Sequence, residues 1–203
     1  MNILLLADTE DPLLWDYFQP ERVNGYDLIL SAGDIKAEYL TFLVTMSNLP
    51  VFYVHGNHNA AYDHYPPEGC ECIDDRLVVY KGLRILGLGG SAVYSGEPYQ
   101  YTESEMRRRI ARLRYRVWRA GGVDIVLTHC PPKGYGDAED DYAHRGFSAF
   151  LPMLDRWKPK ALVHGHVHMT YGNVPRELRY GETRIINAWL RYPLTVDLPQ
   201  TDK

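Results

Sequence analysis

Five short apolar runs, each leading within a few residues to Asp, Asn or His, constrain the fold of this 203-residue chain more than any other feature. Runs of this length that end in glycine or polar residues are typical of buried strands. In open α/β sheets, ligands bind beyond the carboxyl ends of the strands, so the pattern predicts one shared crevice. The polar residues that follow the runs are Asp8, Asp34, Asn57 with His58, His129, and His166 with His168.

Helical patterns lie between the runs. Residues 37–47 predict a helix that stops before Pro50, and Thr102 with Glu105 forms a capping box that opens a helix to about Ala120. Ser148 is expected to cap a third helical segment. Further strand-like runs predict a second sheet, and they cover residues 77–80, 83–88, 183–186 and 194–198. No repeat or linker divides the chain, so we expect a single domain over residues 1–203.

The composition is that of an ordinary globular protein, with 45% hydrophobic and 24% charged residues. The net charge of −4 gives no overall basic footprint for nucleic acid or for an anionic membrane. The arginine-rich stretch 107–119 is interpreted as a solvated helix face. The first apolar run is too short for a signal peptide, and no segment reaches the roughly 20 apolar residues that span a bilayer. We therefore expect a cytoplasmic protein without membrane or nucleic-acid partners, its three cysteines being free thiols.

The residues at the run ends form a metal-ligand set. Carboxylate, amide and imidazole donors without thiolate suit divalent manganese, iron or zinc. One carboxylate can bridge two ions roughly 3.5–4 Å apart, and Asp34, directly after Gly33, is the best candidate for this role. Gly165 would allow a tight turn that lets His166 and His168 face different ions.

The order of these motifs resembles the calcineurin-like metallophosphoesterase superfamily, and the match spans residues 8–168. The resemblance implies an α/β fold, a four-layer α-β-β-α sandwich of two mixed sheets flanked by helices. It also implies that Asp8 and His168 bind a first metal, and that Asp34 bridges both metals. The second metal would be held by Asn57, His129 and His166. His58 would not bind metal but would hydrogen-bond the phosphate or protonate the leaving oxygen.

Two positions depart from the family pattern. Glu10 stands where the family usually has His, and Asn59 stands where an acidic residue is common. Glu10 is expected to be an oxygen ligand, and the added negative charge favours manganese over iron, zinc or nickel. Alternatively, the first site is weak and fills only at high metal concentration.

The resulting expectation is a hydrolase that attacks phosphomonoesters or phosphodiesters with a water activated by two metals. Its partner would be a small phosphoester that contacts Asn57 and His58, and His144 is a further candidate for substrate contact. His55 and His164 are interpreted as hydrogen-bonded structural residues, and His64 as a surface residue. A non-catalytic scaffold with a degraded first metal site is the alternative, and a nuclease is a third hypothesis that rests on the arginines alone.

Overall fold

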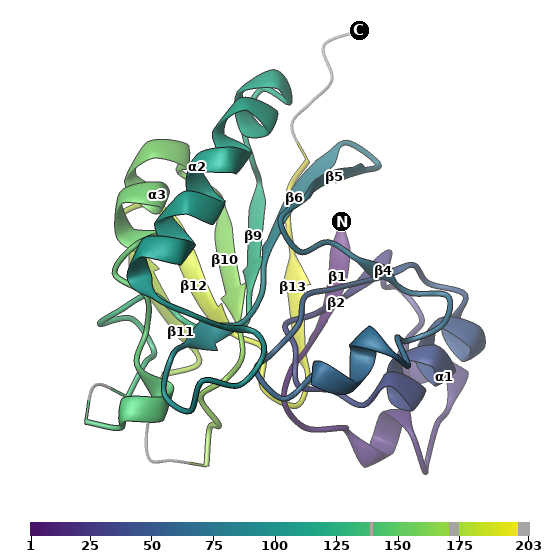
Figure 1. The fold of residues 1–203 in the computed structure, drawn as a ribbon. Coiled ribbons are helices and arrows are strands. Elements are labelled where there is room, and N and C mark those ends of the chain that lie inside the picture. Colours follow the sequence, from purple (N-terminus) through teal and green to yellow (C-terminus); the bar gives the residue numbers. More distant parts are fainter. Residues whose placement is uncertain (139, 171–174, 199–203) are drawn as a thin grey trace, which may run out of the picture.

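The computed structural model describes residues 1–138, 140–170 and 175–198. Two mixed β-sheets pack face to face, with helix α1 outside one sheet and helices α2 and α3 outside the other (Figure 1). This four-layer arrangement confirms the predicted fold class.

The first sheet has the strand order β13–β1–β2–β3–β4. Its strands are β1 (Asn2–Leu6), β2 (Leu28–Ser31), β3 (Val51–Tyr53), β4 (Glu71–Cys72) and β13 (Tyr192–Thr195). The first four run parallel, whereas β13 pairs antiparallel with β1. The prediction that residues 194–198 belong to the second sheet is therefore wrong: the chain returns across the interface and Leu194 pairs with Ile3 at the edge of the first sheet.

The second sheet has the order β11–β12–β10–β9–β6–β5. Its strands are β5 (Leu77–Tyr80), β6 (Leu83–Leu88), β9 (Ile125–Thr128), β10 (Ala161–His164), β11 (Glu177–Tyr180) and β12 (Thr183–Asn187). The four central strands are parallel and the two edge strands antiparallel. A short parallel pair, β7 (Ser91–Ala92) with β8 (Gln100–Tyr101), lies beyond the end of β6.

The main apolar core lies between the two sheets. Successive side chains of a strand point to opposite faces, so Ile3 and Leu5 of β1 face the second sheet. Leu4 and Leu6 instead pack with α1 (Ala37–Ser47). Because the central strands are covered on both faces, they are continuous apolar runs in the sequence.

The outer helices begin and end largely as predicted. The Thr102–Glu105 capping box opens α2 (Glu103–Arg119), and α1 ends at Asn48, which has a left-handed φ of 55°. Ser148, however, does not cap α3 (Phe150–Trp157), whose N-cap is Ala149. The carboxylate of Glu103 replaces the Ser148 hydroxyl there, since it accepts the backbone N–H groups of Ser148 and Ala149 at 2.6 and 3.0 Å. That N-cap prediction was wrong because the acceptor comes from another helix.

Short 3-10 helices in the described part of the chain are η1 (Pro12–Leu14), η2 (Pro20–Arg22), η3 (Ala60–Asp63) and η4 (Tyr142–His144). Within the described ranges, no helix has both the length and the apolar character needed to cross a membrane.

Candidate metal centre

The carboxyl ends of β1, β2 and β3 in one sheet meet those of β9 and β10 in the other. Hydrogen bonds join the segments there: the Asp8 amide donates to Gly33 at 3.1 Å, and the Gly165 amide to His129 at 3.0 Å. A cavity of about 720 Å³ opens at this edge. The expected site residues that line it are Asp8, Glu10, Asp34, Asn57, His58, His144, His166 and His168. The ring of His129 is fully buried beside them.

Three candidate ligands adopt backbone conformations that side chains rarely tolerate. Asp8, Asp34 and His166 have φ angles of 64°, 55° and 69°. Such left-handed residues cost of the order of 1–3 kcal/mol each and persist only where surrounding contacts impose them. Gly165 is required for a different reason: a Cβ atom there would lie 2.6 Å from Ala7 Cβ and 2.7 Å from Asp8 Oδ2. The strand-end turns therefore place the side chains at the cost of local strain.

Asp34 lies at the centre of the contacts. Its Oδ1 accepts the His58 backbone N–H at 2.8 Å, and its Oδ2 lies 3.2 Å from His129 Nε2. Single donor atoms from Asp8, Asp34 and His129 all lie within 4.8 Å of one another. These are separations that one or two bound cations can span.

The imidazole of His129 is held by its other nitrogen. Nδ1 donates to the Ala32 carbonyl at 2.7 Å, so Nε2 is directed to Asp34 and to Asn57 Oδ1 at 3.0 Å. The Asn57 amide is oriented in turn, because its Nδ2 donates to the Tyr94 hydroxyl at 2.9 Å. In the sequence, Tyr94 is one of several tyrosines near a glycine-rich segment, and no local pattern reveals this contact.

His166 is fixed in the same manner. Its Nε2–H donates to the Ala143 carbonyl at 2.8 Å, which leaves Nδ1 as the nitrogen available to a metal. Its backbone N–H donates to both oxygens of Asp8, at 2.9 and 3.1 Å. A carboxylate or backbone carbonyl partner on the outer nitrogen is the usual environment of a metal-binding histidine.

Asn59, whose role the sequence left open, joins two of the strand-end loops. Its Oδ1 accepts the backbone N–H groups of Asp34 and Gly56 at 2.8 and 2.7 Å, and its Nδ2 donates to the Ile35 carbonyl at 3.2 Å. An aspartate could make the first two bonds but not the third, since it has no donor when ionised. The asparagine at this position, where the family commonly has an acidic residue, thus has a partner that needs an amide donor, the Ile35 carbonyl.

Glu10 lies in the cavity but faces Lys36. Its Oε1 accepts the Lys36 backbone N–H at 2.9 Å, and its Oε2 is 3.6 Å from the Lys36 ammonium group. Lys36, which the sequence reasoning missed, also lines the cavity.

The rim of the cavity carries further histidines. The exposed side chain of His58 and the half-buried side chain of His168 both line it. His144 also lines it, with Nδ1 2.6 Å from Asp141 Oδ2 and its ring 4.9 Å from that of His166. His55 and His164 are hydrogen-bonded to Asp74 and to the Gly165 carbonyl, as expected of structural histidines.

Burial and charge shift the titration of the centre. Burial raises the pKa of Asp8 to about 7. Burial acts on Asp34 in the same direction, but the charge and hydrogen bond of His129 outweigh it and lower the Asp34 pKa. Conversely, burial would lower the pKa of His129, yet Asp34 raises it. Burial and the His129 charge hold the pKa of His166 well below its ordinary value. Without metal, a proton on His129 therefore offsets the negative charge of Asp34 and Asp8. A bound cation would take over this role and displace the proton.

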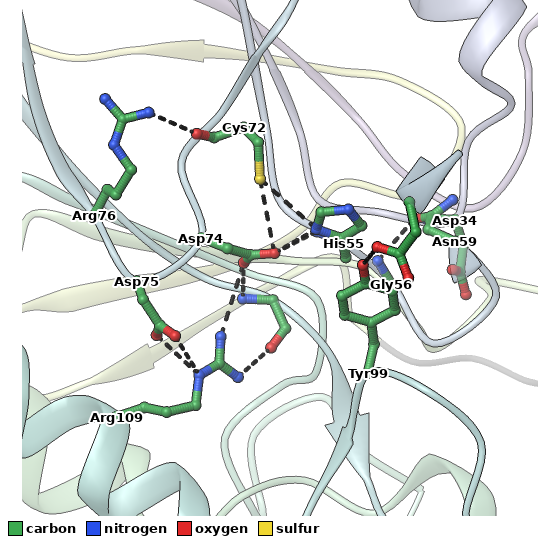
Figure 2. A network of polar contacts seen from close by, with 12 residues as sticks. Asp34, His55, Gly56, Asn59, Cys72, Asp74, Asp75, Arg76, Tyr99 and Arg109 are labelled. Atoms are coloured by element: carbon green, nitrogen blue, oxygen red, sulfur yellow. Dashed lines mark hydrogen bonds and ion pairs between the residues drawn. The ribbon is translucent and has the colours of Figure 1, made fainter. Parts of the chain in front are cut away.

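A polar network supports the Asn57–His58 loop from behind. Figure 2 shows Asp74 between His55 and Arg109: its Oδ2 binds the His55 ring at 2.6 Å, and its Oδ1 accepts the Gly89 N–H at 2.6 Å. Arg109 donates to the Gly89 carbonyl at 2.7 Å, and Tyr99 stacks on His55 at 4.2 Å. The network ties the end of β3 to β6 and α2.

His55, Cys72 and Asp74 form a second group with metal-ligand spacing. The Nδ1 atom of His55 already pairs with Oδ2 of Asp74, and the Arg109 guanidinium lies 3.9 Å from Oδ1 of the same carboxylate. A cation there would stand beside a positive charge, so we interpret this group as structural.

The donor set at the strand ends therefore fits divalent metal ions. It combines half-buried carboxylates, an oriented amide oxygen and imidazoles whose outer nitrogens bind carbonyl oxygens. These are the donor types and supporting contacts that divalent transition metals favour.

Comparison with known proteins agrees with this geometry. A sequence model of the calcineurin-like phosphoesterases matches residues 1–170. A UPF0046 protein of Caenorhabditis elegans is 31% identical, over 85% of this chain and 52% of its own length. Human metallophosphoesterase domain-containing protein 1 is 25% identical, over 89% of this chain and 67% of its own. A solved structure from Thermus thermophilus shares the fold, with a TM-score of 0.61 at 16% identity over 93% of this chain and 88% of that one.

Proposed function

Because the chain belongs to the calcineurin-like phosphoesterase family, we propose that it is a metal-dependent hydrolase of small phosphomonoesters or phosphodiesters. The observation that carries this proposal is the convergence of Asp8, Asp34 and His129 from three separate strand ends, with donor atoms within 4.8 Å of one another. The centre opens into a cavity large enough for a small molecule.

The proposed centre would hold two ions. Asp8 and His168 would bind the first, and Asn57, His129 and His166 would bind the second. Asp34 would serve both, in keeping with its central position between His58 and His129. Glu10, whose Oε1 accepts the Lys36 N–H, would be a further oxygen donor for the first ion. Manganese is the proposed metal, since carboxylate-rich sites favour harder ions.

Two bound divalent ions would supply Lewis acidity for the phosphoryl oxygens and a water that ionises near neutral pH. The protein's own groups then position the ester. Asn57 is held by Tyr94 with its oxygen towards His129. His58 is anchored through its backbone N–H, and its imidazole, which lines the cavity, protonates the leaving oxygen. His144 and Lys36 line the same cavity, which supports a role for both in contacting the substrate.

Two variants separate chemistry from metal binding. His58→Ala should retain its metal and lose about 10²–10⁴-fold in turnover, the usual contribution of a general acid. Asp34→Asn should lose metal, because the candidate bridging carboxylate is removed. Metal content by elemental analysis and steady-state rates on p-nitrophenyl monoesters and diesters, with added manganese, measure both effects.

His64→Ala is the matched control, since His64 is an exposed histidine at the end of η3. It should keep both metal and activity. Full turnover in His58→Ala would remove the acid role, and full metal content with activity in Asp34→Asn would refute the proposed centre.

A further inference from the structure

Helix α2 carries a concentrated positive charge in a chain of net charge −4. No acidic residue occurs between Met106 and Ala120. The helix is rich in arginine but contains no lysine, and all but one of its arginines are exposed: Arg107, Arg108, Arg112, Arg114, Arg116 and Arg119. On the sequence alone, this stretch is interpreted as a solvated face.

The structure places two large aromatic side chains on that same face. Tyr115 is 65% exposed and Trp118 is 74% exposed, and their ring centroids lie 5.8 Å apart. The opposite face of the helix buries Met106, Leu113 and Val117 in the core. The two rings therefore have no part in the packing of this helix against its sheet.

Helical spacing orders these residues into adjacent stripes. Positions three or four apart share a face, so Tyr115 stands between Arg112 and Arg119. Trp118 lies in a second stripe, on the C-terminal side of Arg107 and Arg114. Arg108 lies one turn before Arg112 in the first stripe. With a rise of 1.5 Å per residue, the stripes from Arg108 to Arg119 and from Arg107 to Trp118 are each about 16 Å long. We call the seven residues Arg107, Arg108, Arg112, Arg114, Tyr115, Trp118 and Arg119 the basic-aromatic face.

Much of the charge on this face is uncompensated. Arg109, which is buried, pairs with Asp75, and Arg107 lies 3.9 Å from Glu103. Arg112, Arg114 and Arg119 have no carboxylate within ion-pair distance among the residues that the structure describes. Like charges repel along the helix, and a bound polyanion would relieve that repulsion.

We propose that the basic-aromatic face binds single-stranded nucleic acid. The guanidinium groups contact phosphates in a bidentate manner, and unstacked bases lie on the Tyr115 and Trp118 rings. A lipid surface fits less well, because a helix that lies in a membrane interface turns its apolar face to the lipid, whereas α2 turns that face to the core. None of the residues that line the metal-site cavity belongs to α2. This binding is independent of the proposed hydrolysis.

Fluorescence anisotropy of a labelled single-stranded oligonucleotide of about 20 nucleotides tests the proposal on the full chain, with the salt concentration varied. Each phosphate contact contributes about 0.7 to the slope of log affinity against log salt for single strands. The triple variant Arg112→Glu/Arg114→Glu/Arg119→Glu should therefore lower the slope by roughly 2. Tyr115→Ala/Trp118→Ala should weaken binding by roughly 5- to 150-fold per stacked base and leave the slope unchanged.

Arg179→Glu is the control for charge reversal, because Arg179 is an exposed arginine of β11. It should leave affinity and slope as they are. Thermal melting checks that each variant is folded, and turnover of a small phosphoester should be the same in all of them. Absence of salt-dependent binding, or binding that survives both sets of changes, would overturn the proposal. Equal or tighter binding of polyglutamate or of anionic vesicles would overturn it too, and would assign the face to an acidic protein or a membrane.

Discussion

Three ligands of the candidate site, His129, His166 and Asn57, are each oriented by a contact on the outer side of the group. The backbone carbonyls of Ala32 and Ala143 accept from His129 and His166, and these bonds select which nitrogen remains for a metal. Among the residues that the structure describes, no carbonyl accepts from the Asn57 amide, which donates to the Tyr94 hydroxyl instead. The backbone partners cannot be altered by substitution, whereas Tyr94 can.

Tyr94→Phe should therefore weaken metal binding without removing a ligand. The Asn57 amide would lose the acceptor that keeps its oxygen turned towards His129. Loss of a supporting contact of this kind typically costs 10–100-fold in metal affinity. Isothermal titration of the metal-free protein with manganese measures the change. Tyr65→Phe, at an exposed tyrosine on the rim of the same cavity, should bind as tightly as the unaltered chain; an equal loss in both variants would argue against the orienting role.

At the scale of elements, strand β9 is fixed at its beginning by a buried ion pair. Asp124 directly precedes β9 and accepts from Arg84 Nε at 2.8 Å and from the Arg84 backbone N–H at 3.0 Å. Its own carbonyl accepts from the Lys160 N–H at 2.9 Å. One residue thus joins β6 and the start of β10 to the strand between them, and His129 directly follows that strand.

Asp124→Asn should destabilise the fold by about 2 kcal/mol at neutral pH, because a charged hydrogen bond is lost and Arg84 is left with a weaker partner. Burial would raise the pKa of Asp124, but the bonds from Arg84 outweigh it and lower that pKa. A carboxylate with a lowered pKa stabilises the fold above its unfolded pKa of about 3.9, and this contribution disappears as the pH falls through the folded value. Urea unfolding of both proteins from pH 7 to pH 3 should show the difference in their free energies of unfolding shrinking below about pH 4.

The control is Asp16→Asn, at an exposed carboxylate, which should change stability little at any pH. A destabilisation by Asp124→Asn that does not depend on pH would exclude the ionic contribution.

Local patterns predicted the five strands that lead to the candidate site, all buried on both faces, and also helices α1 and α2. Strands β1, β2, β3, β9 and β10 were recognisable because each is a short apolar run that ends in polar residues. The place of β13 was not, since strand order depends on which edge a returning chain meets rather than on its own residues. The contacts of Tyr94 and Asn59 escaped prediction for a related reason: they join loops that are 37 and 25 residues apart in the sequence.

At the scale of the whole molecule, the candidate centre spans the two halves of the sandwich. Asp8, Asp34 and Asn57 follow strands of the first sheet, whereas His129, His166 and His168 follow strands of the second. An ion bound by ligands from both sheets would link the two sheets at this edge. Without metal, carboxylates and imidazoles lie close together there. Metal binding should therefore act on the global unfolding of the chain and not only on local order.

Manganese should accordingly raise the thermal unfolding temperature of the chelator-treated protein. A ligand that binds only the folded state adds about 2.7 kcal/mol at one hundred times its dissociation constant. For a domain of this size, each kcal/mol corresponds to roughly 2–4 °C, so the expected shift is about 5–10 °C. Differential scanning calorimetry with increasing metal measures it. Asp34→Asn should lose the shift, while Asp16→Asn, which changes an exposed carboxylate, should keep it. An unshifted transition in the unaltered chain, at concentrations where elemental analysis finds the metal bound, would mean that the unfolded chain binds the ion as tightly as the folded one, and would contradict a site assembled from both sheets.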